Sequence, residues 1–301
     1  MLSASSRTRS PRLTGPCYTE AMKFPLTLDP AVVETFRNDG FVLTPGVFSA
    51  GEIARFREAV DTEVAARTAG DSRSLADKSR YEQSFIQCMR LWETSPGVRV
   101  LSCDARLAGI AAQLLGEEEM LLWQDQALYK EPGGETTTPH QDQPFWPIGN
   151  APLVSAWIPL VDVDEHNGAM AYVPGSHHCG KLKVVDITHT TEPYDILEDP
   201  ELGGRKPVQV NARAGDVVWH HGFSVHQATA NQSDEVRRVF TTVYLARGYP
   251  REKSWPVFPL DRAGVEVGES MEGEGMPQVW PPPDSLPEAP GQRGQATGPQ
   301  H

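Results

Sequence analysis

Two segments that lie far apart along the chain hold side chains able to ligate a metal. The first carries His140 and Asp142, which follow a strand-like run and a Pro/Gly loop. In extended backbone, residues i and i+2 point to the same side, so both can face one metal. The second carries His220, His221 and His226, each a candidate third ligand. Two histidines and one carboxylate on one face of an octahedral metal form the typical ligand set of non-haem Fe(II) oxygenases.

Arg237 adds a possible co-substrate site to this ligand set. It lies eleven residues after His226. A guanidinium is planar and can bind a carboxylate through two parallel hydrogen bonds. Ligands and arginine together predict an iron enzyme that uses 2-oxoglutarate and O2.

Three blocks of the sequence resemble the phytanoyl-CoA dioxygenase family. In chain order they read "LYKEPGG…PHQDQPFWP", "NGAMAYVPGSH" and "GDVVWHHGFSVHQATANQSDEVRRVFTTVYL". The resemblance extends from about Asp39 to Leu245 and is specific, because three separate blocks occur in the right order. It implies a double-stranded β-helix that binds Fe(II) and 2-oxoglutarate.

The resemblance also assigns roles to individual residues. The family's metal ligands, which are also its catalytic residues, fall on His140, Asp142 and His226. Its 2-oxoglutarate arginine falls on Arg237. This assignment selects His226 from the three histidines that the residues alone left open.

Further co-substrate contacts are implied by the same resemblance. Gln126 and Trp157 match positions that face 2-oxoglutarate in relatives. The family often has a serine two residues after the distal histidine, where this chain has Ala228. The clamp on the far carboxylate must then depend more on Arg237, or on another hydroxyl such as Thr241.

Aromatic residues near the expected site are candidates for substrate contacts, because ligand pockets are mostly apolar. Phe145 and Trp146 directly follow the His-x-Asp motif and are expected to face the substrate. Trp123 and Met89 are further candidates, although packing in the barrel core would explain many aromatic residues here. An acyl-CoA, a free metabolite and a natural-product scaffold all remain open, and the lack of an obvious basic cluster for CoA favours a small molecule.

The hydrophobic periodicity predicts helices first and strands later. Asp29-Pro30 and Ser49 are expected to begin helices, and Gly40 and Gly116 to end them. The predicted strands are residues 120–129, 153–163, 169–173, 207–210, 216–219 and 237–246. This order indicates an α+β or mainly β fold, a jelly-roll, cupin-like barrel with an N-terminal helical layer.

Composition divides the chain into three parts. Residues 1–22 are expected to be a disordered extension, and residues 23–263 the dioxygenase domain. Residues 264–301 are rich in Gly, Pro, Gln and Glu, which predicts a disordered tail. We saw no internal repeat in the sequence.

Charge and cysteine usage limit the partners and the compartment. The 301-residue chain has a net charge of −13, which argues against nucleic acid or an anionic membrane as the main partner. Its four cysteines form no C-x-x-C pair and follow no secretory signal, so a reducing, cytoplasmic location is expected. The sequence does not indicate an oligomeric state.

The predicted function is that of an Fe(II)/2-oxoglutarate-dependent dioxygenase. It would hydroxylate a C–H bond of a small organic molecule, and oxidative decarboxylation would convert 2-oxoglutarate to succinate and CO2. The main alternative is a metal-binding, cupin-like protein that is inactive towards 2-oxoglutarate and serves in binding or sensing. A metal enzyme that does not use 2-oxoglutarate is disfavoured by Arg237, and a radical halogenase by Asp142.

Overall fold

The computed structural model describes residues 27–187 and 194–291. The predicted N-terminal extension, residues 1–22, lies outside these ranges. So does the last part of the predicted C-terminal tail, residues 292–301.

The N-terminal third forms helices at the predicted capping signals. Helix α1 (Pro30–Asp39) begins where the Asp29 carboxylate accepts a backbone hydrogen bond, and ends at Gly40, whose φ is 80°. Helix α2 (Ala50–Thr68) begins with a capping box at Ser49. Both helices begin at the predicted caps, which satisfy backbone groups that a helix end leaves unpaired, so the helix predictions are confirmed.

The other helices are α3 (Arg80–Ser84), α4 (Pro96–Ser102), α5 (Ala105–Leu115) and α6 (Phe258–Ala263). The short 3₁₀ helices are η1 (Leu75–Asp77), η2 (Leu91–Glu93), η3 (Gln143–Phe145), η4 (Ser176–Cys179), η5 (Ile196–Glu198) and η6 (Pro200–Leu202).

A seven-stranded antiparallel sheet, the major sheet, forms one wall of the domain. Its strand order is β1-β8-β5-β10-β3-β11, and β2 also pairs with β3. The strands are β1 (Phe41–Thr44), β8 (Val217–His221), β5 (Leu153–Pro159), β10 (Arg237–Ala246), β3 (Met120–Lys130), β11 (Gln278–Trp280) and β2 (Ile86–Met89).

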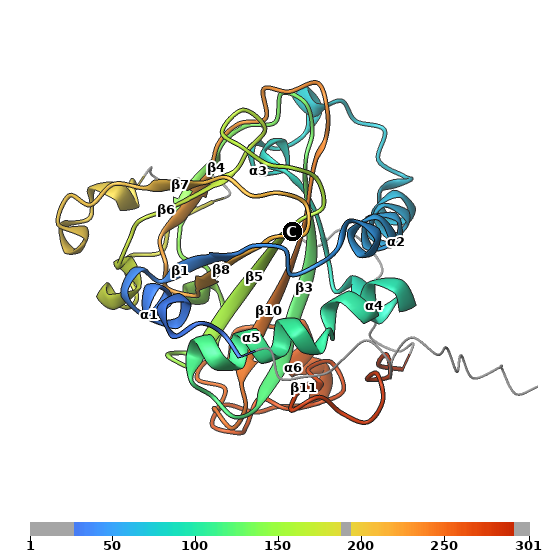
Figure 1. The fold of residues 1–301 in the computed structure, drawn as a ribbon, viewed down its shortest axis with the longest axis vertical. Coiled ribbons are helices and arrows are strands. Elements are labelled where there is room, and N and C mark those ends of the chain that lie inside the picture. The colour runs from blue at the N-terminus through green and yellow to red at the C-terminus, as the bar shows by residue number, and fades with distance from the viewer. Residues whose placement is uncertain (1–26, 188–193, 292–301) are drawn as a thin grey trace, which may run out of the picture.

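A four-stranded antiparallel sheet, the minor sheet, faces the major sheet (Figure 1). Its order is β4-β9-β6-β7, and its strands are β4 (Thr137–His140), β9 (His226–Ala228), β6 (Met170–Tyr172) and β7 (Val208–Val210). From β3 onwards the chain passes repeatedly between the two sheets. This alternation is the jelly-roll arrangement that was predicted.

Buried side chains pack against both faces of the major sheet. On the outer face, apolar residues of α2, α4 and α5 pack against the strands, as Leu107 and Trp219 do in one cluster. On the inner face, Trp157 and Val239 of the major sheet pack with Tyr172 of the minor sheet. The helical layer therefore supports the sheet from behind, and the inner face is left to build a site.

The C-terminal segment corrects the prediction of a disordered tail. Strand β11 pairs with β3, and Met271, Met276 and Val279 are at most 1% exposed. The ring of Trp280 lies against α5, where a Cβ at Gly109 would be 2.9 Å from its Cζ3. The average composition was misleading, because a few apolar residues at the right positions are enough to dock a polar segment.

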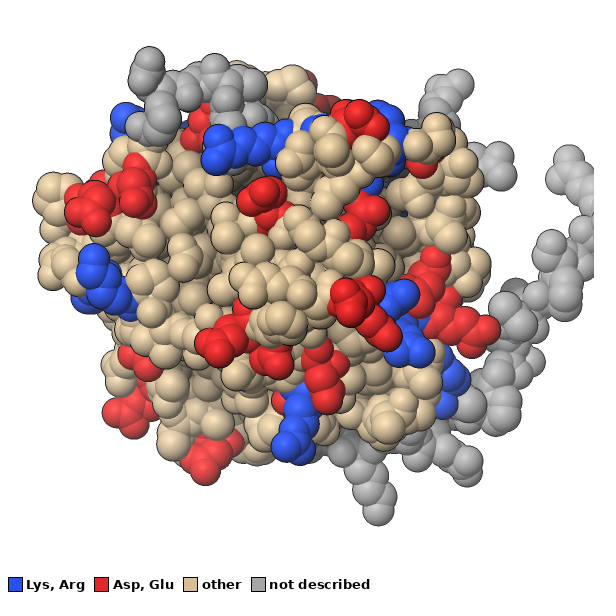
Figure 2. Space-filling model, turned by 90° about the horizontal axis from the view of Figure 1, so that it is seen from above, with Lys and Arg blue, Asp and Glu red and all other residues tan. Residues whose placement is uncertain are grey.

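Figure 2 shows one face of the molecule, on which acidic and basic side chains are interspersed and no continuous basic patch is seen. Within the described part of the chain, no helix has both the length and the apolar character needed to span a membrane.

Candidate metal and co-substrate site

The three predicted metal ligands meet at the inner face of the minor sheet. Strands β4 and β9 pair so that His140 lies directly opposite His226. Asp142 follows β4 by two residues, at the start of η3. One candidate ligand atom from each of the three lies within 4.8 Å of the others, a group that could hold a metal ion.

Hydrogen bonds orient both histidines so that the same ring nitrogen is available to a metal. His140 Nδ1 lies 2.7 Å from the Thr138 carbonyl oxygen, and His226 Nδ1 lies 3.0 Å from the Ser224 carbonyl oxygen. Each Nδ1 therefore carries the proton, and each Nε2 has its lone pair free. Hydrogen bonds to the nitrogen that does not face the metal fix the tautomer and ring orientation of metal-binding histidines.

The Asp142 carboxylate divides its two oxygens between different neighbours. Oδ1 is the oxygen nearer to the ligand histidines, 3.3 Å from His140 Nε2 and 3.6 Å from His226 Nε2. Oδ2 lies 3.3 Å from Nε2 of His220, a residue of β8 that is 2% exposed. The Tyr172 hydroxyl lies 3.2 Å from the other His220 nitrogen, Nδ1.

These contacts form a consistent chain of donors. Burial raises the pKa of Tyr172 well above its ordinary value, and the Asp142 charge adds to this, so the phenol keeps its proton. Tyr172 then donates to His220 Nδ1, and His220 donates from Nε2 to Asp142. His220 is thus a partner of the carboxylate in this structure rather than a member of the ligand group.

His221, the third histidine that the sequence left open, lies on the other side of β8. Its Nδ1 accepts a hydrogen bond of 3.1 Å from the Phe223 backbone, and its ring lies 5.3 Å from that of His177. The alternation of side chains along a strand separates it from His220.

The ionisation of the group suits metal binding. Burial alone would raise the pKa of Asp142, but the surrounding histidines, His226 first and then His140 and His220, hold it well below its ordinary value. Burial lowers the pKa of His226 to about 3, against the opposing effect of Asp142. An ionised carboxylate and a neutral imidazole are the forms that ligate metals.

Arg237 lies at the inner end of the cavity with part of its guanidinium unpaired. It is 3% exposed, its Nη1 donates to the Gly168 carbonyl oxygen at 3.3 Å, and its Cζ lies 5.7 Å from the Trp157 ring centroid. Burial lowers the pKa of Arg237 to about 9, which still leaves it cationic at neutral pH. Among the described residues, its Nε and the buried Thr241 hydroxyl have no hydrogen-bond partner.

Two unpaired polar groups at one buried end of a cavity are costly unless a ligand pairs with them. Arg237 offers donors to an anion, and Thr241 offers a hydroxyl, which is the group expected to replace the serine absent at Ala228. The far carboxylate of 2-oxoglutarate fits this donor set. The residues present are therefore suited to both the metal and the co-substrate.

Lys130 is a second buried cation near this end. It pairs in register with Arg237 across β3 and β10, and its Nζ contacts the Glu135 carbonyl oxygen and Thr137 Oγ1. Burial, together with the charge of Arg237, lowers the pKa of Lys130 to about 7. An anion bound at Arg237 would relieve this repulsion.

A cavity of about 400 Å³ connects the metal group with Arg237. Gln126 and Trp157 line it, at neighbouring positions on either side of Thr241 in the sheet. Of the predicted substrate contacts, Phe145, Trp146 and Met89 also line it. The cavity falls within the size range of sites for small molecules.

Trp123 lies outside this lining. The register between β3 and β10 shifts beside it, which interrupts the alternation of side chains along β3. Its ring packs edge-on against Trp146, with centroids 6.2 Å apart, in a buried cluster that includes Leu153 and Val243. Trp123 therefore supports a cavity residue from behind, and sequence alone gave no sign of the irregularity.

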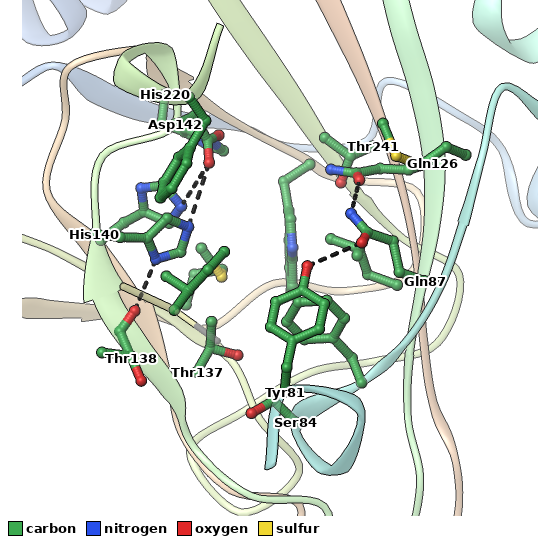
Figure 3. Close-up of a pocket in the computed structure, with 18 of the residues that line it drawn as sticks. Tyr81, Ser84, Gln87, Gln126, Thr137, Thr138, His140, Asp142, His220 and Thr241 are labelled. Atoms are coloured by element: carbon green, nitrogen blue, oxygen red, sulfur yellow. Dashed lines mark hydrogen bonds and ion pairs between the residues drawn. The ribbon is translucent and has the colours of Figure 1, made fainter. Parts of the chain in front are cut away.

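Several cavity residues were not found from the sequence. Tyr81, Gln87 and Ser84 reach the cavity from α3 and β2, opposite the metal group (Figure 3). Tyr172 reaches His220 from the minor sheet. These side chains have ordinary types in short elements, and only the long-range strand pairing brings them to the site.

Comparisons with known proteins identify the family of this chain. The family model "Phytanoyl-CoA dioxygenase (PhyH)" matches residues 36–239. A "Phytanoyl-CoA dioxygenase domain-containing protein 1" from Danio rerio is 32% identical over 128 residues, which are 40% of this chain and only 43% of that protein.

Two solved structures from nogalamycin biosynthesis share the fold over most of both chains. The non-haem, alpha-ketoglutarate-dependent carbocyclase SnoK is 30% identical, with a TM-score of 0.66 over 84% of this chain and 96% of that one. The epimerase SnoN, in complex with Fe3+, alpha-ketoglutarate and nogalamycin RO, is 27% identical, with a TM-score of 0.66 over 83% and 100%. With its His140–Asp142–His226 group and a family match over most of its length, the chain belongs to the phytanoyl-CoA dioxygenase family of iron- and 2-oxoglutarate-dependent oxygenases.

Proposed function

We propose that the protein hydroxylates a C–H bond of a small organic molecule, using 2-oxoglutarate and O2. One oxygen atom of O2 would enter the product as a hydroxyl group, and the other would enter succinate as CO2 is released. The observation that carries the proposal is the buried, partly unpaired Arg237 guanidinium in the same cavity as the ligand group. A protein that only stored or sensed a metal would have no need of it.

The side chains of the site have separable roles in this proposal. His140, Asp142 and His226 would hold Fe(II), which supplies the oxidising chemistry together with 2-oxoglutarate and O2. Carbonyl contacts at Nδ1 keep both imidazoles in the tautomer that offers Nε2. His220 holds one oxygen of Asp142 and leaves the other directed towards the histidines.

The end of the cavity around Arg237 would bind 2-oxoglutarate through its positive charge and its shape. Arg237 would hold the far carboxylate through charge-assisted hydrogen bonds, with Thr241 as a further partner. The Trp157 ring lies over the guanidinium and limits its movement. Gln126, next to Thr241 in the sheet, would contact the co-substrate from the neighbouring strand.

The substrate end is largely apolar. Phe145, Trp146 and Met89 line the cavity there, and we assign them to substrate contact. Their rings and thioether would exclude water from the reacting C–H bond, which limits side reactions of a strong oxidant.

The test is a turnover assay with Fe(II), O2 and 2-oxoglutarate against a panel of small organic molecules. We expect succinate release that depends on Fe(II), that rises with the true substrate, and that yields a product heavier by one oxygen. Asp142→Ala should release none. Absence of succinate from iron-loaded protein with every panel member would favour the binding or sensing alternative.

Product mass also separates hydroxylation from the other outcomes that the neighbours' names raise. SnoK is described as a carbocyclase and SnoN as an epimerase. Ring closure would give a product lighter by two hydrogens, and epimerisation one of unchanged mass. Either result would refute hydroxylation while retaining the oxygenase class.

A further inference from the structure

Three uncharged polar side chains form a hydrogen-bonded row along the cavity wall across from the metal ligands (Figure 3). The Tyr81 hydroxyl donates to Gln87 Oε1 at 2.9 Å, and Gln87 Nε2 donates to Gln126 Oε1 at 2.6 Å. They come from α3, β2 and β3, which brings distant parts of the sequence together. We call Tyr81, Gln87 and Gln126 the polar row.

The polar row keeps hydrogen-bonding capacity for a ligand. Each amide nitrogen has two N–H groups, and Gln87 uses one of them for Gln126. The amide nitrogen of Gln126 has no acceptor among the described residues, and the Tyr81 oxygen can still accept. Burial raises the pKa of Tyr81 to about 12, with a contribution from the Asp142 charge, so the phenol stays neutral.

Full charges are confined to the other end of the cavity. Among the described lining residues, the acidic and strongly basic side chains are Asp142 and Arg237, both of which the proposed function uses. Around the polar row the wall is apolar, formed by Phe85, Met89, Leu128, Phe145, Trp146 and Ile187.

Two described cations in a neighbouring hollow are already paired with carboxylates. A second hollow of about 220 Å³ shares Tyr81, Phe85 and Gln87 with the cavity and contains Arg73 and Lys78. Arg73 is paired with Asp71 at 2.9 Å and with Glu82 at 2.6 Å, and Lys78 with Glu131 at 2.5 Å. An anionic substrate would have to break these ion pairs to gain a partner.

We infer that the polar row selects an uncharged substrate that presents a carbonyl, amide or hydroxyl oxygen beside an apolar ring system. The oxygen would accept the second N–H group of Gln87, whose amide Tyr81 and Gln126 hold in position, and the ring would pack on Phe145 and Trp146. This inference rests on the proposed function for the reaction, and it adds the substrate class. A carboxylate or phosphate would lose water here without gaining an opposite charge, which is strongly unfavourable.

Binding to matched ligands tests the inference without requiring turnover. The probes are naphthamide and naphthoate, together with larger polycyclic amides and acids of identical ring size. Affinity is measured by calorimetry on protein loaded with Ni(II) and 2-oxoglutarate, which keeps the site closed to oxidation. We expect the amides to bind at least about 10-fold more tightly than the acids.

Charge substitution at Gln87 should redirect this preference. Gln87→Leu should weaken amide binding by about 3- to 10-fold, the effect of a neutral hydrogen bond, and leave acid binding nearly unchanged. Gln87→Lys should reverse the preference towards the acid. If that variant does not fold, Gln87→Glu provides the opposite test, since it should favour naphthylmethylamine, an alkylamine that is cationic at neutral pH.

Tyr81→Phe removes the hydroxyl that donates to Gln87 and should weaken amide binding. Tyr249→Phe is the matched control, because Tyr249 lies outside the cavity lining and its hydroxyl contacts Glu117 at 3.5 Å. Equal or tighter binding of the acids to the wild type would overturn the inference, and so would no binding of any amide. Failure of the proposed function differs from both outcomes, because it would abolish succinate release while the ligand preference remained.

Discussion

Nε2 of His220 contacts Oδ2 of Asp142 at 3.3 Å, whereas the ligand histidines approach Oδ1. His220 therefore acts as a positioning residue that keeps the carboxylate turned with one oxygen towards the metal. Removing a residue that holds a metal ligand in position commonly lowers metal affinity by about 10- to 100-fold.

We predict this loss for His220→Leu, with partial recovery in His220→Gln, whose amide can still donate to Asp142. Tyr172→Phe should have a smaller effect. The measurement is Co(II) titration followed by the visible absorption of the bound ion, with His221→Leu as the control. Complete loss of metal in His220→Leu, equal to that of His226→Ala, would mean that His220 is itself a ligand.

A second prediction concerns the ligand group. His140→Ala, Asp142→Ala and His226→Ala should each abolish Fe(II)-dependent turnover, because an open site needs all three protein ligands. Far-ultraviolet circular dichroism should remain that of the wild type, since the sheets are held by their own core. Retention of stoichiometric iron by any one of these variants would contradict the assignment of that residue.

A third prediction concerns Arg237 and its neighbour. Loss of a hydrogen bond to a charged group costs about 1.5–3 kcal/mol, which is roughly 10- to 150-fold in affinity. Arg237→Lys should raise the KM for 2-oxoglutarate strongly, and Arg237→Ala more so, with metal content unchanged. Arg238→Ala is the control, because Arg238 points away and pairs with Asp61 at 3.2 Å. A larger effect for Arg238 would contradict the co-substrate site.

A fourth prediction concerns proton uptake at Lys130. The pKa of Lys130 is lowered to about 7, first by burial and then by Arg237. A carboxylate bound beside Arg237 would favour the charged amine, so 2-oxoglutarate should bind with proton uptake near pH 8. Calorimetry in two buffers of different ionisation enthalpy measures this uptake. It should vanish in Lys130→Met, and equal uptake in both proteins would rule Lys130 out.

The same group predicts the sign of a stability change with pH. Between the folded-state pKa of about 7 and the ordinary value of 10.5, the unfolded chain binds more protons than the folded one. Stability should therefore rise with pH in this window, by at most roughly 1.4 kcal/mol per unit. Denaturant unfolding of wild type and Lys130→Met across that window should show the difference.

A fifth prediction concerns the docked C-terminal segment. Deleting residues 271–301 removes Met271, Met276 and Val279 from the core and should lower the Tm markedly. Gly109→Ala should also destabilise, by about 1–3 kcal/mol, because its methyl would press on Trp280. The control is Gly51→Ala in α2, where the added methyl meets nothing closer than 3.9 Å. An unchanged Tm after the deletion would contradict the docking.

Helix ends and strand bounds could be predicted from the sequence where they depend on residues close together in the chain. The caps of α1 and α2 depend on residues within one turn, and β10 has the predicted bounds because its apolar and β-branched residues are continuous. The spacing of His140 and Asp142 likewise predicted that both side chains can face one metal. The choice of His226 over its two neighbours needed the family resemblance.

Features that depend on long-range pairing were not predictable. The β6–β9 register places Tyr172 beside His226 and within reach of His220. The irregularity at Trp123 depends on β10, more than a hundred residues away in sequence. The polar row likewise requires β2 to pair with β3, which no short-range pattern specifies.

The position of β11 near the end of the chain determines when one edge of the major sheet becomes paired during synthesis. One edge of β3 pairs with β10, and β2 covers the other edge at residues 126–129. On that second edge, Met120 and Leu121 pair with Gln278–Trp280. Until those residues leave the ribosome, this stretch presents unpaired backbone groups that can join strands of other chains. A nascent chain stalled before residue 278 would contain every residue of the site. It would still expose an unpaired edge of β3, which β11 covers in the complete structure, and this edge would favour aggregation.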